Sequence, residues 1–148
     1  MKASELMIGD WVNIYVFPNE NPQIEDLFPA RISTIMTPLP SENSGEHIEC
    51  VFKVKDGGIG RAARPVETCL PIPLTAEILE KNGFRKYPLM GEQRHFIYTY
   101  GKVSLLAIYD ADFSCHLCSE AWKVKYVHEL QQILRVCKEN KKADNFKV

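Results

Sequence analysis

The segment Cys115-His-Leu-Cys118 combines residue types and spacing that could do chemistry. Two cysteines separated by two residues can bind zinc or exchange disulfides, because a thiolate is both a metal ligand and a nucleophile. Zinc needs two further ligands, and His128 and Cys137 are the nearest spare candidates along the chain. The flanking sequence favours a strand, however, on which positions three apart point to opposite faces. We therefore expect two separate half-buried thiols, with no bound metal ion and no cofactor.

Two other motifs also have a chemical interpretation. His128 precedes Glu129, and a carboxylate beside a histidine can orient a general base. With no nucleophile spaced near it, we interpret His128 as a residue on the flank of a helix. Gly57-Gly-Ile-Gly60 is similar to a phosphate-binding loop, but such loops lead into a helix N-terminus. Here Pro65 and β-type sequence follow, so we predict a hairpin turn instead.

Aromatic and basic side chains in two parts of the chain suggest binding rather than catalysis. Aromatic rings together with positive charge are typical of surfaces that bind peptides or nucleic acids. The alternative is a packed core surrounded by solvated charges. The candidate binding residues are Trp11, Tyr15, Arg61, Arg64, Lys123 and Lys125.

Composition excludes several classes of protein. The chain has 148 residues, of which 45% are apolar and 25% charged, as in ordinary soluble globular proteins. No run of about 18 apolar residues is present, so we expect no membrane span. The five cysteines and the absence of a secretory signal indicate free thiols in the cytoplasm.

The charge is divided unevenly along the chain. The net charge of −1 argues against a general nucleic-acid-binding protein. Residues 1–73 carry six Lys/Arg and ten Asp/Glu, a net charge of −4, whereas residues 74–148 carry twelve and nine, a net charge of +3. This division predicts two modules, with a modest basic surface on the second.

The two modules should meet at the segment from Pro71 to Phe84. Its sequence predicts a short helix with capping signals at both its N-terminus and its C-terminus. Thr75 is placed to cap the N-terminus with its hydroxyl. Asn82-Gly83 should end the helix, with Phe84 folding back on Leu79 as in a Schellman motif. Two small modules joined by such a short junction should fold as one cooperative unit.

The predicted fold class is α+β. Short β-type segments in residues 1–73, separated by polar loops at Pro18–Pro29 and Thr37–Glu46, suggest an SH3-like barrel, because closure removes exposed strand edges. Residues 74–148 should form a helix, an antiparallel meander and a final helix. That final helix is predicted over roughly 126–140 from the spacing of its apolar residues, and the polar tail 141–148 should fray. The apolar residues that show this helical spacing are Val127, Leu130, Ile133, Leu134 and Cys137.

Three stretches together resemble an uncharacterised family of small proteins from gut anaerobic bacteria and their phages. They are Glu5-Leu-Met-Ile-Gly-Asp-Trp-Val12, the segment Pro71–Phe84, and Val124-Lys-Tyr-Val-His-Glu-Leu-Gln131. Members usually continue the third stretch with Asn-Leu and an aromatic residue, where this chain has Gln132-Ile-Leu134. The resemblance implies a shared fold and a bacterial or phage setting, and no particular chemistry.

Taken together, these patterns favour a non-enzymatic interaction or accessory protein with a protein partner. One alternative is a nucleic-acid-associated protein that uses the basic second half. A second alternative is a small metal-dependent or hydrolytic enzyme around Cys115, Cys118 and His128.

Overall fold

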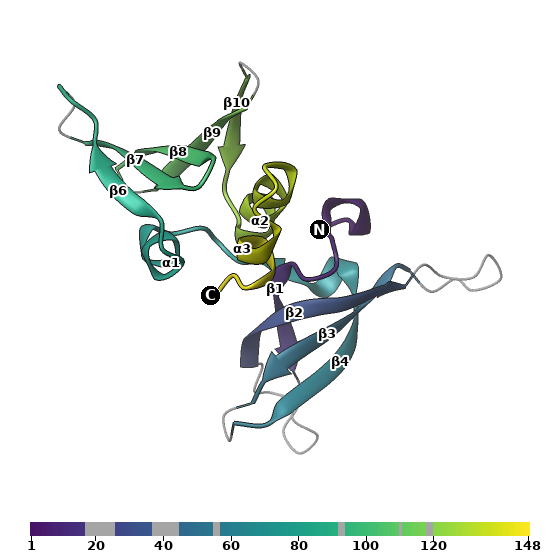
Figure 1. Ribbon diagram of the computed structural model, residues 1–148. Coiled ribbons are helices and arrows are strands. Elements are labelled where there is room, and N and C mark those ends of the chain that lie inside the picture. The colour runs from purple at the N-terminus through teal and green to yellow at the C-terminus, as the bar shows by residue number, and fades with distance from the viewer. Residues whose placement is uncertain (17–25, 37–44, 55–56, 92–93, 110, 118–119) are drawn as a thin grey trace. The chain divides into compact units, whose positions relative to one another are not determined.

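The computed structural model (Figure 1) describes residues 1–16, 26–36, 45–54, 57–91, 94–109, 111–117 and 120–148. The chain divides into two compact units, Met1–Ile72 and Pro73–Val148, one residue before the predicted boundary. In the described residues each unit contains one five-stranded antiparallel sheet. That the two units unfold in a single transition stays a prediction.

The first unit is a sheet with the strand order β4-β3-β2-β1-β5. The strands are β1 (Trp11–Val16), β2 (Asp26–Met36), β3 (His47–Lys53), β4 (Ile59–Pro65) and β5 (Leu70–Pro71). Short 3₁₀ turns lie at Ala3–Glu5 and Val66–Thr68. The predicted hairpin between β3 and β4 is confirmed, with Gly57 in the left-handed region at φ 88°.

The predicted SH3-like barrel is wrong, because the sheet stays open. Among the described residues, β4 and β5 are the two edges, and no strand pairing joins them. After β4 the chain turns through Val66–Thr68, and of the described residues that follow, Leu70 and Pro71 pair with β1. Proline lacks the N–H that a strand ladder needs, so Pro65 and Pro71 limit backbone pairing here.

The core of the first unit lies on one face of its sheet. Alternation places Val12 and Ile14 of β1 on this face, both fully buried, while Trp11 and Tyr15 lie half-buried on the other. Phe52 of β3 pairs with Gly60 of β4, and its ring covers the glycine. A Cβ atom at Gly60 would lie 2.5 Å from Cζ of that ring, so only glycine fits.

We expect Gly60→Ala to lower the free energy of unfolding by about 1–3 kcal/mol, because the added methyl group forces the buried Phe52 ring to move. Urea denaturation of the purified variant measures this loss. Gly45→Ala is the matched control, since its Cβ would meet only the flexible Glu67 carboxylate at 3.6 Å. Equal losses in the two variants would contradict this packing.

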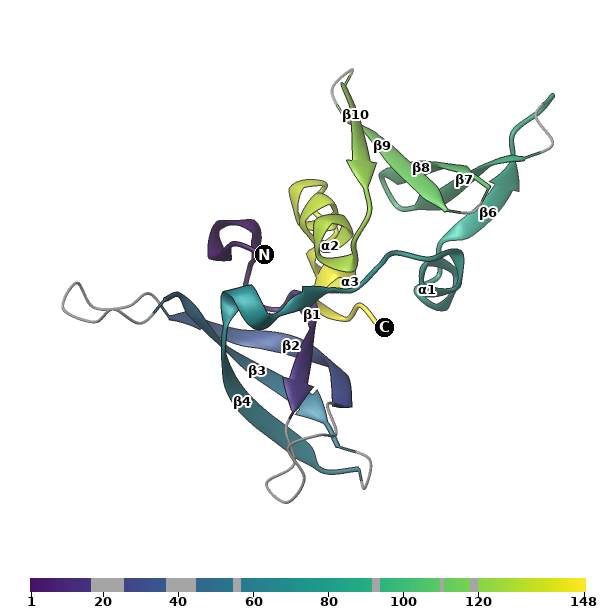
Figure 2. The same cartoon turned by 180° about the vertical axis from the view of Figure 1, so that it is seen from behind.

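The second unit is a sheet in the order β10-β9-β8-β7-β6, accompanied by helices (Figures 1 and 2). Its strands are β6 (Arg85–Pro88), β7 (His95–Tyr100), β8 (Val103–Ile108), β9 (Asp112–Leu117) and β10 (Glu120–Val124). Its helices are α1 (Ala76–Lys81), α2 (Val127–Val136) and α3 (Asn140–Asp144). Strands outweigh these short helices, so the protein is mainly β and the α+β assignment is corrected.

The ends of α1 are confirmed as predicted. The hydroxyl of Thr75 accepts a hydrogen bond from the Ile78 N–H at 3.2 Å. At the other end, Phe84 N–H donates to Leu79 O at 3.1 Å, and Gly83, at φ 78°, donates to Glu80 O at 2.8 Å. These two bonds define a Schellman ending. Leu79 and Phe84 are both buried.

The prediction that residues 141–148 fray is wrong. Two apolar residues of this mainly polar tail, Ala143 and Phe146, are buried. The buried Asn82 amide donates to Lys147 O at 2.7 Å and accepts from Lys147 N–H at 2.9 Å. A side chain distant in sequence therefore satisfies the backbone of the tail, and no local pattern reveals such a partner.

We expect Asn82→Ala to lower the free energy of unfolding by about 1–3 kcal/mol, because it removes the hydrogen bonds of a buried amide to Ile78 O and to the part-buried backbone of Lys147. It should also speed cleavage of the tail by carboxypeptidase. Asn145→Ala is the control, since the exposed Asn145 amide bonds only within its own helix, to Lys141 O at 2.7 Å. A larger loss in the control would contradict the anchoring role of Asn82.

Candidate functional site

The structure places three of the four binding candidates of the first unit on one face of its sheet. Trp11 and Tyr15 of β1 lie on the outer face of the sheet, opposite the core. The register aligns Trp11, Arg31, Val51 and Arg61 in one row across β1, β2, β3 and β4. Adjacent strands lie about 4.8 Å apart, so Trp11 and Arg61 are about 14 Å from each other. They share a face without touching.

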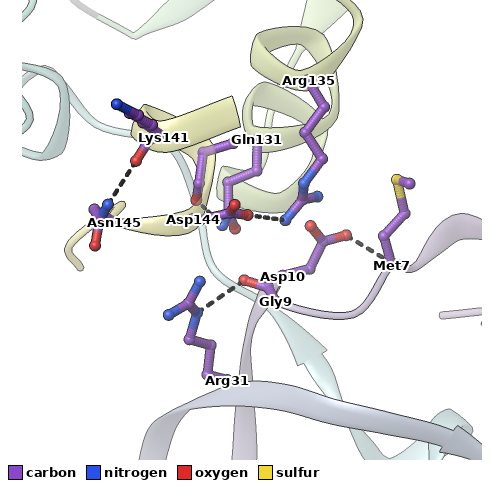
Figure 3. A network of polar contacts seen from close by, with 10 residues as sticks. Met7, Gly9, Asp10, Arg31, Gln131, Arg135, Lys141, Asp144 and Asn145 are labelled. Atoms are coloured by element: carbon purple, nitrogen blue, oxygen red, sulfur yellow. Dashed lines mark hydrogen bonds and ion pairs between the residues drawn. The ribbon is translucent and has the colours of Figure 1, made fainter. Parts of the chain in front are cut away.

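Arg64 does not join that row. It lies on the inner face of β4, where its Nε donates to Tyr15 O at 3.0 Å and its Nη1 donates to Ala63 O at 2.8 Å. The guanidinium thus links β4 to β1 on the side where strand pairing is missing. Arg31 likewise donates through Nε to Gly9 O at 3.1 Å (Figure 3). Both arginines bond the protein's own backbone.

The residues of the enzymatic alternative do not form a described site. Cys115 is buried on the inner face of β9, beside Leu105 of β8. His128 lies on α2 as predicted and is buried, and its ring stacks on Tyr126 at a centroid distance of 5.8 Å. Cys118 lies outside the described residues. In the described ranges, no three His, Cys, Asp or Glu side chains gather as metal ligands.

A groove between β10 and α2 is the candidate binding site of the second unit. It has a volume of about 320 Å³, and we call it the β10–α2 groove. Trp122 forms one wall and Val136 the other, with exposed fractions of 53% and 74%. The lining residues are Trp122, Lys123, Glu129, Gln132, Ile133 and Val136.

The α2 wall of this groove follows from the helical repeat. Val127, Leu130 and Leu134 form the predicted core face of α2 and are fully buried. The groove uses the neighbouring helix face, on which lining residues recur at intervals of three and four positions. Ile133 belongs to both faces. Sequence reasoning missed this second face, whose signal was the apolar Val136 outside the core spacing.

Polar contacts hold α2 in place. Glu129 Oε2 accepts from the N–H groups of Lys125 and Tyr126, at 2.7 and 3.1 Å, which satisfies backbone donors at the start of the helix. The buried Gln131 donates to Ala143 O at 2.9 Å, and Arg135 pairs with Asp144 at 3.7 Å (Figure 3). The start of α2 is therefore capped by its own Glu129, and the helix is tied along its length to α3.

A second hollow, of about 540 Å³, lies beside β10 and is lined by residues of β8, β9, β10 and the segment before α1. Lys123 lines both hollows, and Lys125 lines the second one together with Asp112 and Ser114 of β9. Both lysines are exposed. Apolar residues such as Leu74, Phe113 and Val124 line the second hollow as well, so it combines apolar surface with the charges of Lys123, Lys125 and Asp112.

Two of the other basic residues in the second half are engaged in contacts within the protein. Arg135 is engaged with Asp144, and Lys142 lies over the Tyr100 ring at 5.2 Å. Burial, with a smaller effect of Lys147, lowers the pKa of Lys142. These contacts direct two positive charges toward the protein rather than toward a phosphate backbone.

Comparison with family models, with curated proteins and with solved structures finds no match for this chain. Among the residues that the structure describes, no helix has both the length and the apolar character to cross a bilayer. The site must therefore be interpreted from its own geometry.

The thiol chemistry of the first unit is governed by burial. Burial, reinforced by the nearby Cys69, raises the pKa of Cys50 to about 12 from the ordinary value of 9.0. The unfolded chain therefore loses this proton at lower pH than the folded protein. We expect the stability advantage of the wild type over Cys50→Ala to shrink as the pH rises from 9 to 12. Urea denaturation at several pH values measures it, and a pH-independent difference would contradict the burial of a neutral thiol.

Proposed function

We propose that this protein is a non-enzymatic interaction module that binds a segment of a protein partner in the β10–α2 groove. The observation that carries the proposal is the pair of exposed apolar side chains, Trp122 and Val136, on the two walls of one groove. Aromatic residues flanked by a polar rim are typical of the centres of protein interfaces. The resemblance to bacterial and phage proteins suggests a partner in such a setting.

The construction of the groove supports a binding role. Its lining residue Ile133 is buried, and its helix is capped by Glu129 and tied to α3 through Gln131. A wall that is already ordered loses little conformational freedom on binding, and this favours affinity. The volume of about 320 Å³ suits one or two inserted side chains.

Selection of a random peptide library on the immobilised protein tests this function. We expect enriched peptides whose affinity falls at least about tenfold in Trp122→Ala and in Val136→Lys, because central interface residues contribute most of the binding energy. Ile59→Lys is the matched control, since Ile59 is also β-branched and 74% exposed but lies in the first unit. Failure to enrich any peptide, or an equal loss in the control, would contradict the proposal.

The nucleic-acid alternative makes a different prediction. Phosphate contacts release counterions, so affinity for a labelled single-stranded DNA would fall steeply between about 50 and 200 mM salt. Binding of that DNA in the absence of peptide binding would replace the interaction module with this alternative.

A further inference from the structure

We propose that the partner segment binds as an added β-strand on the free edge of β10, with apolar side chains on one face and acidic side chains on the other. This inference rests on the proposed function and specifies the chemistry of its ligand. The juxtaposition that suggests it is an edge strand with the apolar β10–α2 groove on its inner face and Lys123 on its other face, beside a second hollow that Lys123 and Lys125 help to line.

The backbone of β10 is available for pairing along one side. In the described part of the chain β10 pairs with β9 and with no other strand, so it is an edge of the sheet (Figures 1 and 2). The residues that follow β10 are bridged, since Leu74 N–H donates to Lys125 O at 2.8 Å and Pro73 pairs with Tyr126. An edge strand presents a row of backbone groups that an extended peptide can use.

Alternation along β10 determines the pattern of the peptide. The register pairs Trp122 with Cys115 and Val124 with Phe113, and three of these four side chains are buried on the inner face. Lys123, paired with Ser114, therefore faces the other way. In a strand added beside β10, successive side chains point to the same two faces of the sheet as those of β10. Its apolar residues therefore enter the β10–α2 groove, and the residues between them meet Lys123 and Lys125.

The charges beside β10 favour acidic residues at those positions. Lys123 and Lys125 outnumber Asp112, the acidic residue in the same hollow. On the groove side, the carboxylate of Glu129 is already bonded to two backbone N–H groups. A partner carboxylate therefore meets a net positive hollow, which favours association with acidic over basic segments.

The opposite edge of the same sheet lacks these features. The edge strand β6 ends in Pro88, which cannot donate to a ladder, and it carries the exposed Arg85 and Lys86. Charged residues and proline are the usual means of blocking edge pairing. Its hollow, of about 290 Å³, is lined by residues such as Arg85 and Thr99 with little apolar surface.

The test uses the full-length protein and fluorescein-labelled peptides with alternating valine and aspartate, followed by fluorescence anisotropy. We expect the alternating Val/Asp peptide to bind at least about tenfold more tightly than the same peptide N-methylated at every second residue on its pairing edge, since methylation removes the ladder hydrogen bonds. A Val/Lys peptide should bind more weakly than the Val/Asp peptide.

Charge reversal tests the lysine-lined face. Lys123→Glu should weaken binding of the Val/Asp peptide about fivefold and strengthen that of the Val/Lys peptide. Lys102→Glu is the control, because Lys102 is exposed in the β7–β8 turn and its reversal changes the net charge equally. Equal effects of the two reversals would overturn the assignment of the acidic positions.

The remaining outcomes separate this inference from the function on which it rests. Library peptides that need Trp122 and Val136 but tolerate N-methylation would leave the proposed function intact and overturn strand addition. Concentration-dependent dimerisation that Lys123→Pro abolishes would show that a second copy of the protein occupies the edge of β10. That result would overturn the proposed peptide ligand. If no peptide binds, the proposed function fails together with the inference.

Discussion

The second unit depends on the hydrogen bonds of one buried amide, that of Asn82. It donates to Ile78 O within α1 and to Lys147 O, and it accepts from Lys147 N–H. Because it fixes the tail, Phe146 can be buried and α3 can form. Gln131 then connects α3 to α2, which is the wall of the β10–α2 groove. The shape of the candidate site thus depends on a side chain in a different element.

The first unit shows the same use of side chains in place of backbone pairing. Its sheet stays open between the edges β4 and β5, and Arg64 of β4 donates to the backbone of Tyr15 in β1. The close approach of Phe52 to Gly60 completes the packing of the same strand. An arginine used in this way is unavailable to a ligand. The outer row of Trp11, Arg31 and Arg61 is therefore separate from Arg64, although all of these residues lie in one small sheet.

The functional proposal follows from how the second unit distributes apolar surface. Trp122 pairs with the buried Cys115, yet more than half of it is exposed. Val136 on α2 is more exposed still, and the two side chains belong to one groove at a sheet edge. Burying such surface against a partner gains free energy in proportion to the apolar area removed from water. A peptide that also continues the sheet would gain backbone hydrogen bonds.

The sequence alone determined the elements whose signals lie within a few residues of one another. The caps of α1, the hairpins at Gly57 and Gly101 and the core face of α2 all follow from such local patterns. Tertiary structure decided whether the first sheet closes, whether the tail is ordered and where the groove lies. The Arg64–Tyr15 and Asn82–Lys147 bonds join residues 49 and 65 positions apart. Trp122 and Val136 line one groove because α2 packs beside β10. Contacts of this range leave no periodic pattern in the chain, because each partner is an ordinary polar or apolar residue until folding places it opposite the other.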